Sequence, residues 1–282
     1  REYLELVVPD MGSLTSRLKY QFERLVSVLF LLARHLGEEF SQSAFRAVGM
    51  EVPVGEDGVV HPLPIWASDG TPVAITGKID RVDAFRDATG SYARVVDYKS
   101  GGKEFRLEEV LQGLNMQMLI YLFTLCDDPS TPYGPLEPAG ILYMPGNVSA
   151  VRTSVDADPE EVRREVDRRL QMSGLVLGEE NVLRAMEREL EGKYIPVQKK
   201  KDDTFTAASK TGSREEFAQI RQLVYQNIRE MADELLGGRV SPRPAKSARL
   251  DPCDYCDYRQ LCNAAARPGE GQEETGKGED EE

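Results

Sequence analysis

The segment from Gly77 to Lys99 constrains the fold more than any other part of this 282-residue chain. It reads GKIDRVDAF, then a turn at Asp87 to Ser91, then YARVVDYK, so two β-prone runs flank turn-forming residues. This pattern predicts a hairpin with Asp80 on one strand and Asp97 on the next. Because alternate residues of a strand share a face, Asp97 and Lys99 are expected to point the same way.

The rest of the chain alternates between helical and strand-like patterns. Apolar residues at three- and four-residue steps predict helices over residues 13–37, 107–126, 158–170, 181–191 and 211–236. Residues 45–94 are expected to form a strand meander, and residues 139–144 a short buried strand. Residues 194–213 are polar and basic without apolar periodicity, which predicts a mobile loop. The mixture predicts an α/β (α+β) fold.

Charge and hydropathy set the domain limits. The formal net charge is −13, of which residues 270–282 supply −6, with seven acidic residues and one lysine. That segment is expected to be disordered, and the remaining −7 does not exclude a nucleic-acid partner. The predicted organisation is a helical part over 1–44, a core over 45–265 and an acidic tail over 266–282. The longest apolar run in the N-terminal part, residues 25–33, is too short to cross a bilayer, which favours a cytoplasmic protein.

Two carboxylates and an ammonium group on one hairpin have the chemistry needed to hydrolyse a phosphodiester. Asp80 and Asp97 are candidate ligands for Mg²⁺ or Mn²⁺, and a carbonyl near Tyr98 is a further one. Lys99 would orient the water or offset the developing negative charge. Glu51, on the preceding strand, is a candidate additional metal ligand. The alternative is a surface hairpin with an ordinary salt bridge between Asp97 and Lys99.

The helix after the hairpin favours a site over a bare salt bridge. Gln117 and Tyr121 are four residues apart, so they share one face of an otherwise apolar helix, where buried polar groups need partners. Together, G-x-I-D-R-x-D, D-Y-K-S-G and Q-x-x-x-Y resemble the RecB-type branch of the PD-(D/E)xK nucleases. The resemblance implies a restriction-endonuclease-like core, a central mixed sheet flanked by helices. It also implies that Asp80 and Asp97 bind metal, that Lys99 is the catalytic lysine, and that Gln117 and Tyr121 support the site and contact substrate.

A cysteine cluster lies near the C-terminus. Cys253, Cys256 and Cys262 form C-x2-C-x5-C, a thiolate spacing suited to a soft metal, with zinc as one alternative. The family resemblance implies a [4Fe–4S] cluster in a C-terminal segment, completed by a cysteine that lies before the catalytic motifs. Cys126 ends an apolar helix and is typical of a core residue. The missing ligand is therefore expected upstream, if the chain begins inside a larger protein.

The order of all these features, over about residues 11–264, is similar to the C-terminal nuclease domain of the AddB-type helicase–nuclease family. This implies an exonuclease acting on single-stranded or unwound DNA in double-strand break repair and homologous recombination, with an AddA-like partner subunit. No G-x-x-x-x-G-K-[ST] motif occurs, so ATP binding through a P-loop is not expected here. The alternatives are a CRISPR-associated RecB-like Fe–S exonuclease and a catalytically silent DNA-binding scaffold. Lysines 199–201 and 210 are candidate contacts to a DNA backbone.

Overall fold

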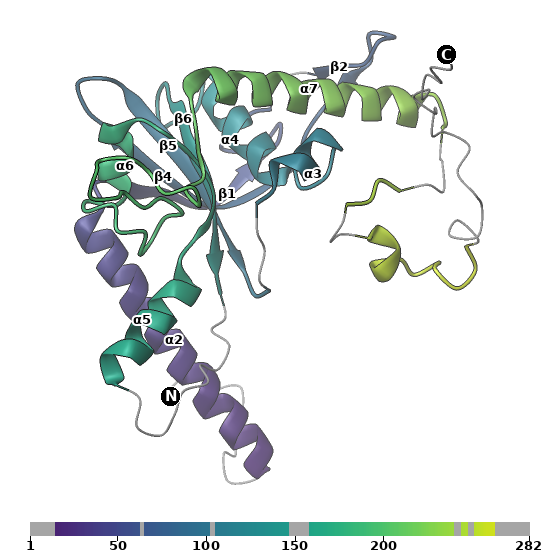
Figure 1. The fold of residues 1–282 in the computed structure, drawn as a ribbon. Coiled ribbons are helices and arrows are strands. Elements are labelled where there is room, and N and C mark those ends of the chain that lie inside the picture. The colour runs from purple at the N-terminus through teal and green to yellow at the C-terminus, as the bar shows by residue number, and fades with distance from the viewer. Residues whose placement is uncertain are drawn as a thin grey trace, which may run out of the picture.

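A six-stranded mixed sheet forms the centre of the computed structural model, which describes residues 15–62, 65–101, 105–146, 158–239, 244–247 and 251–262 (Figure 1). In spatial order the strands are β1 (Arg46–Val54), β4 (Gly77–Arg86), β5 (Ser91–Lys99), β6 (Glu137–Pro145), β7 (Ser173–Leu177) and β8 (Thr211–Gly212). A separate two-stranded ribbon pairs β2 (Ile65–Trp66) with β3 (Pro72–Val73). The sheet and the helices beside it confirm the predicted fold class.

The strand pairing explains why the sheet is mixed. β4 pairs antiparallel with both β1 and β5, and β6 pairs antiparallel with β7. β5 and β6 are parallel, as are β7 and β8. A parallel pair needs a crossover, and the chain between β5 and β6 supplies two helices for it. The predicted hairpin is confirmed as β4 and β5, with Arg86 opposite Ser91 beside the turn.

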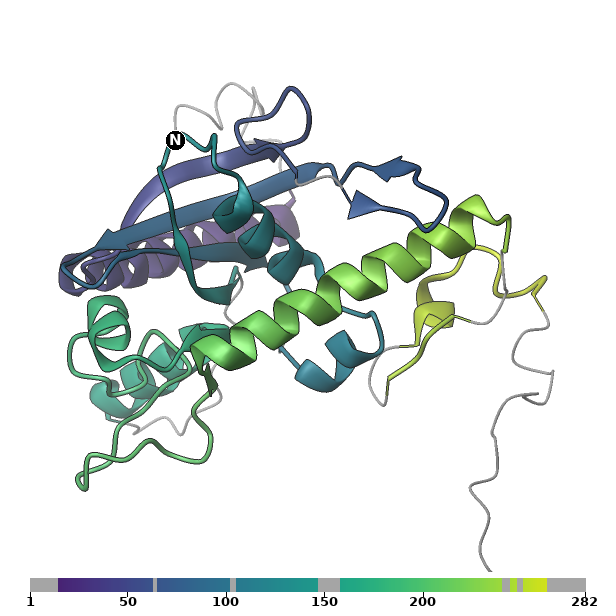
Figure 2. The ribbon, with the colours of Figure 1, turned by 90° about the horizontal axis from the view of Figure 1, so that it is seen from above.

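Helices lie on both faces of the sheet (Figures 1 and 2). The elements on one face are α2 (Ser16–Gln42) and α5 (Pro159–Leu170). Those on the opposite face are α3 (Leu107–Leu111), α4 (Gln117–Asp127) and α7 (Arg214–Leu236). The remaining elements are α6 (Glu180–Met186), beside β7, and the short 3-10 helix η1 (Pro252–Tyr255). Within the described ranges, no helix has the length and apolar character needed to cross a membrane.

Local sequence signals account for the ends of the two longest helices. The Thr15 hydroxyl accepts a hydrogen bond from the Leu18 amide and begins α2. At the start of α7, Ser213 and Glu216 form a reciprocal capping box, and Gly237 ends the helix. The helix predicted over 13–37 is longer at its C-terminal end and runs to Gln42. Its first predicted residues lie outside the described ranges.

The continuous helix predicted over 107–126 is wrong, because the chain breaks it into α3 and α4. Gly113 and Asn115 have φ values of +74° and +54°, which a right-handed helix does not allow. Two hydrogen bonds close the turn between the helices, one from the Gly113 amide to the Val110 carbonyl and one from the Leu114 amide to the Glu109 carbonyl. The break sets where α4 begins, and so where Gln117 lies.

Two further expectations need correction. The helix predicted over 181–191 ends at Met186, because the Glu187 carboxylate accepts hydrogen bonds from the amides of residues 193–195 and turns the chain. The loop predicted as mobile, 194–213, begins as part of the core, since Ile195 and Val197 are almost fully buried. The sequence reading also missed β7, whose short apolar run lies between two helical patterns.

Candidate active site

The two faces of the β4–β5 hairpin carry different groups of charged residues. Arg81 pairs with Val96, so Asp80 and Asp97 occupy the next position on the two adjacent strands. Arg81 contacts Glu39 of α2, so its side chain points to the α2 face. By strand alternation, Asp80 and Asp97 point to the opposite face, where α4 packs.

Asp97 and Lys99 form the centre of the candidate site. The Lys99 Nζ lies 2.6 Å from Asp97 Oδ2, as expected from their two-residue spacing. The Asp97 side chain is 8% exposed, and its Oδ2 is the atom that the Lys99 ammonium contacts. Asp80 is half-buried, and its Oδ2 accepts a hydrogen bond from the Tyr98 amide at 3.1 Å. The hairpin therefore holds two carboxylates and one ammonium group together.

The predicted pair on α4 is confirmed as a contact that reaches β4. The Gln117 Nε2 donates to the Tyr121 hydroxyl at 3.3 Å, and the Lys78 amide donates to the same hydroxyl at 3.4 Å. Tyr121 is buried against Gly77, where a Cβ atom would overlap the tyrosine ring and hydroxyl. Gly77 is thus needed for α4 to approach the strand that carries Asp80.

Glu51 lies near the site, but its carboxylate pairs with Lys78. It lies inside β1 at φ +51°, an uncommon conformation for a residue other than glycine. Its carboxylate forms an ion pair with the Lys78 ammonium, and both side chains are more than half exposed. That pairing, with Asp80 nearby, raises the pKa of Lys78. The structure therefore brings together Asp80, Asp97 and Lys99, and directs Glu51 to Lys78 instead.

Tyr143 of β6 lies beside Asp97 in the sheet and was missed by the sequence reading. It is the strand partner of Asp97 and is 2% exposed. Burial raises the pKa of its hydroxyl, and the carboxylates of Asp97 and Glu109 raise it further. The run AGILYM, residues 139–144, predicts a buried strand but not which strand lies beside it. Tyr143 can be placed next to Asp97 only when the parallel register of β5 and β6 is known.

A second missed feature is a buried charge network on the α2 face, which consists of Arg81, Asp83, Arg94 and Glu39. Arg81 donates to both oxygens of Asp83, at 2.9 and 2.8 Å. Arg94 donates to Asp83 at 2.9 Å and to Glu39 at 2.5 Å. All four side chains are at most 1% exposed. Although burial opposes its charge, the carboxylates of Asp83 and Glu39 raise the pKa of Arg81. The network ties α2 to the hairpin.

The donor set on the α4 face fits a divalent cation. Asp80 and Asp97 offer hard oxygen donors, and Mg²⁺ usually uses one or two protein carboxylates while keeping water and substrate oxygens. The buried Asp97 carboxylate, beside Asp80 on the adjacent strand, is the group that such a cation would contact. No group of three or more Asp, Glu, His or Cys side chains gathers around one point in those ranges.

The cysteine cluster does not form a closed metal site among the described residues. Cys253 is half-buried, whereas Cys256 and Cys262 are exposed, and the three thiols do not meet. Burial of the thiol and the nearby Asp251 carboxylate raise the pKa of Cys253. Cys126 lies on α4 against the core, where burial strongly raises its thiol pKa. These residues alone do not fit a four-thiolate cluster.

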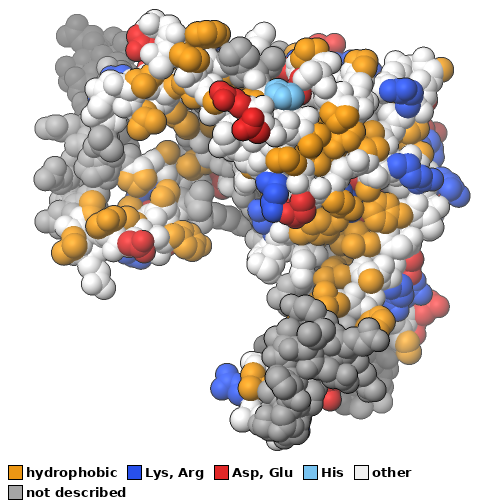
Figure 3. Space-filling view, turned by 180° about the vertical axis from the view of Figure 1, so that it is seen from behind, with side chains coloured by type: hydrophobic (Ala, Val, Ile, Leu, Met, Phe, Trp, Pro, Cys, Tyr) orange, Lys and Arg blue, Asp and Glu red, His pale blue; other side chains and the backbone are white. Residues whose placement is uncertain are grey.

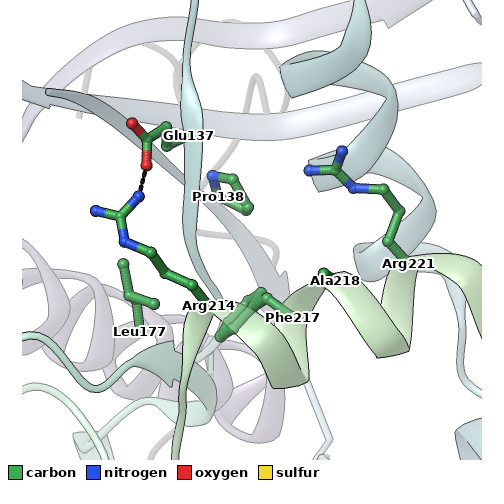
Figure 4. Close-up of a pocket in the computed structure, with 7 residues that line it drawn as sticks. All are labelled: Glu137, Pro138, Leu177, Arg214, Phe217, Ala218 and Arg221. Atoms are coloured by element: carbon green, nitrogen blue, oxygen red, sulfur yellow. Dashed lines mark hydrogen bonds and ion pairs between the residues drawn. The ribbon is translucent and has the colours of Figure 1, made fainter.

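A hollow between β6 and α7 lies away from the predicted site (Figure 4). Arg214 of α7 points into it and pairs with Glu137, and Arg221, at its other side, pairs with Asp127 at 2.9 Å. Glu137 pairs with Tyr92 at the start of β5, about 20 Å along the strand from Lys99. The guanidinium groups of Arg214 and Arg221 are both already paired with carboxylates, so this hollow is not a second candidate for the catalytic centre.

The back of the molecule carries interspersed acidic and basic side chains among hydrophobic ones (Figure 3). The net charge of the whole chain is −13. Contact with an anionic polymer would therefore depend on local groups and on a bound cation, not on a general basic surface.

The comparisons with known proteins agree with this geometry. The sequence profile of the PD-(D/E)XK nuclease superfamily matches residues 1–263. The chain belongs to this superfamily, as the three motifs predicted.

The chain is also similar to AddB-type proteins, each named as one subunit of an ATP-dependent helicase/deoxyribonuclease. It is 33% identical over 248 residues to that of Thermoanaerobacter sp. (strain X514), a match covering 87% of this chain and 22% of the relative. It is 34% identical over 250 residues to that of Caldanaerobacter subterraneus subsp. tengcongensis, covering 88% and 22%. For Acetivibrio thermocellus the identity is 33% over 253 residues, covering 89% and 22%. The chain thus spans about a fifth of the length of these relatives.

Proposed function

We propose that this chain is the Mg²⁺-dependent DNA exonuclease domain of an AddAB-type helicase–nuclease that acts in double-strand break repair and homologous recombination. The observation that carries the proposal is the Asp97–Lys99 ion pair beside Asp80, on the face of the hairpin that α4 covers. The relatives' names supply the deoxyribonuclease activity and favour this reading over a CRISPR-associated enzyme. The partner would be an AddA-like subunit that contributes ATP-driven unwinding, and the protein would act in the cytoplasm.

In the proposed reaction, Asp80 and Asp97 would hold the divalent cation, with a carbonyl near Tyr98 as a further ligand. A bound Mg²⁺ would polarise the phosphoryl oxygens of the scissile bond. Lys99, held 2.6 Å from Asp97, places a positive charge where the phosphorane oxygens become more negative, or orients the attacking water. Tyr121 fixes the start of β4 through the Lys78 amide, and so fixes Asp80.

The substrate strand would leave this site over Lys210. Two adjoining hollows share Phe105 and Lys210, and one of them also contains Ser173. Asp97 pairs with Tyr143, and Tyr143 pairs with Ser173, so this hollow lies two strands, or about 10 Å, from the carboxylates. Lys199, in contrast, is engaged by Glu180 and Asp203. Lys210 is therefore the lysine of this loop best placed to bind a phosphate.

Replacement of Lys210 by alanine tests this path. The variant should raise the KM for single-stranded DNA and lower the salt dependence of binding by about one counterion, with kcat retained. Lys19→Ala, at an exposed position on α2, is the control. A salt dependence unchanged from that of the Lys19 variant would exclude Lys210 as a phosphate contact.

The C-terminal cysteines are proposed to bind a [4Fe–4S] cluster with a ligand from outside this chain. Only the C-x2-C-x5-C spacing supports this, since the described residues do not assemble a complete site. No catalytic step depends on the cluster. Broad absorbance near about 400 nm in the intact protein, lost in Cys256→Ser, is the expected result. Bound zinc without that absorbance would contradict it.

The central experiment compares two carboxylates of the same hairpin. Asp97→Ala should abolish Mg²⁺-dependent cleavage of single-stranded DNA while the protein remains folded. Asp87→Asn, in the turn at the far end of the hairpin about 20 Å away, should retain full activity. Undiminished cleavage by the Asp97 variant would overturn the proposed site, whereas a folded wild-type protein that cleaves no DNA would favour a silent scaffold.

A further inference from the structure

Glu109 is a buried carboxylate that the proposed reaction does not use. It lies on α3 and is 5% exposed. Taking a carboxylate out of water is costly unless its oxygens receive hydrogen bonds, so the contacts that satisfy it indicate what it does.

Those contacts converge on the turn between α3 and α4, residues 112–116. The Glu109 main-chain carbonyl accepts from the amides of Gln112, at 3.1 Å, and Leu114, at 2.8 Å. One carboxylate oxygen accepts from the Asn115 side-chain amide, and the other accepts from the Ser247 hydroxyl at 3.0 Å. Asn115 has φ +54°, so this side-chain contact holds the residue in its uncommon backbone conformation.

The turn is also held from the opposite side. Asn227 of α7 donates to the Val110 carbonyl at 3.1 Å. The Met116 carbonyl then accepts from the Ile120 amide at 2.9 Å and opens α4, whose first residue is Gln117. The position of Gln117 and Tyr121 relative to β4 thus depends on how the turn is fixed.

Glu109 and Asp97 both act on Tyr143, a buried residue of β6. Tyr143 is the strand partner of Asp97. Burial raises the pKa of its hydroxyl, and the carboxylates of Asp97 and Glu109 raise that pKa further. The Glu109 carboxylate therefore contacts the turn that precedes α4 and also acts on a buried tyrosine beside Asp97.

We propose that Glu109 is a positioning residue of the nuclease reaction, acting through Asn115 to aim Gln117 and Tyr121 at the strand that carries Asp80. This rests on the proposed function, but its structural part can be tested without it. Through Ser247, Glu109 also connects the turn to segment 244–247, which precedes the cysteines along the chain.

The test uses two single variants and their combination in the full chain. Glu109→Gln and Asn115→Gly should each lower kcat on single-stranded DNA by about 10- to 100-fold, because small displacements of catalytic groups are that costly. Glycine suits the positive φ at position 115, so this variant removes only the side-chain contact. The double variant should be no slower than the slower single variant, since both changes break one interaction. Affinity for the DNA, measured with Ca²⁺ in place of Mg²⁺, should change by less than about twofold.

Amide hydrogen exchange supplies a readout that does not need activity. In Glu109→Gln, exchange over residues 112–118 should become about tenfold faster while the β4 and β5 amides keep their protection. If the wild-type chain cuts no DNA, the proposed function fails and exchange alone decides the role of Glu109.

Glu187 provides the matched control, because it is a buried glutamate with a purely local role in a different turn. Glu187→Gln should lower the unfolding midpoint without lowering kcat. The proposal is overturned if Glu109→Gln retains wild-type kcat, if the two single effects multiply in the double variant, or if exchange over 112–118 is unchanged.

Discussion

The two faces of the β4–β5 hairpin carry the same kinds of charged side chains, but the side chains have different roles on each face. On the α2 face, Arg81, Arg94 and Asp83 form a dry network with Glu39 in which opposite charges balance. On the α4 face, Asp97 pairs with Lys99, which remains 31% exposed, while Lys78, which also lies near Asp80, pairs with Glu51. One face has an equal number of cations and carboxylates, whereas the other has an excess of carboxylate.

This difference separates structural from catalytic charge. A closed network of ion pairs has no capacity for a ligand, and breaking it leaves a buried charge unpaired. An excess of carboxylate oxygens next to solvent can be neutralised by a divalent cation. The motif D-R-V-D thus divides between the faces, with Asp80 on the α4 face and Arg81 and Asp83 in the network.

The largest effect on stability is expected on the α2 face. Arg94→Met leaves the carboxylates of Asp83 and Glu39 short of one cation, and should lower the free energy of unfolding by about 3–5 kcal/mol. Chemical denaturation monitored by circular dichroism measures this loss. A change below about 1 kcal/mol, the value typical of exposed pairs, would show that the network does not hold α2 to the hairpin.

On the α4 face, the expected effect is on catalysis. Lys99→Ala should lower kcat by about 10²- to 10³-fold, the usual effect of losing one group that stabilises developing negative charge. Its denaturation midpoint should stay close to that of the wild type, because Lys99 is partly exposed. A variant that is inactive because it is unfolded would place Lys99 with the structural charges.

The smallest expected effect is the pH dependence contributed by His35, one helical turn before Glu39. Burial lowers the pKa of His35 in the folded protein below 6.5, although Asp167 lies 3.6 Å away. Between pH 6.5 and that lower pKa, the unfolded chain takes up the proton and the folded chain does not. Stability from this residue is therefore complete above the unfolded pKa and falls as the pH drops, by at most about 1.4 kcal/mol per unit.

Denaturation midpoints of the wild type and His35→Leu at pH 7.5 and 5.5 check this. The wild type should lose more stability than the variant over this interval. Equal losses would mean that His35 is protonated in the folded state. The Asp80 face carries no such buried histidine among the described residues, so activity and stability should follow different pH profiles.

Sequence patterns were sufficient to predict the side-chain contacts on the α4 face, because the residues in each contact are a few positions apart on one strand or one helix. Two-residue spacing on a strand placed Asp97 with Lys99, and four-residue spacing on a helix placed Gln117 with Tyr121. Both contacts depend on backbone geometry within a few residues.

The α2 network and the parallel pairing of β5 with β6 could not be found in this way. Glu39 is 42 residues from Arg81 and 55 from Arg94, and it occurs in a helix whose pattern marks it as an ordinary polar position. Likewise, Tyr143 joins Asp97 only through a crossover. The break at residues 112–116 depends on positive φ values at Gly113 and Asn115, which the apolar periodicity on either side obscured.

Crystals grown with Mn²⁺ and measured for anomalous scattering test the division between the faces most directly. One strong peak should lie between the carboxylates of Asp80 and Asp97, and it should disappear in Asp97→Asn while the Arg81–Asp83 pair stays unchanged. A protein that shows no peak there at saturating Mn²⁺, or whose peak survives the Asp97 substitution, would contradict the account.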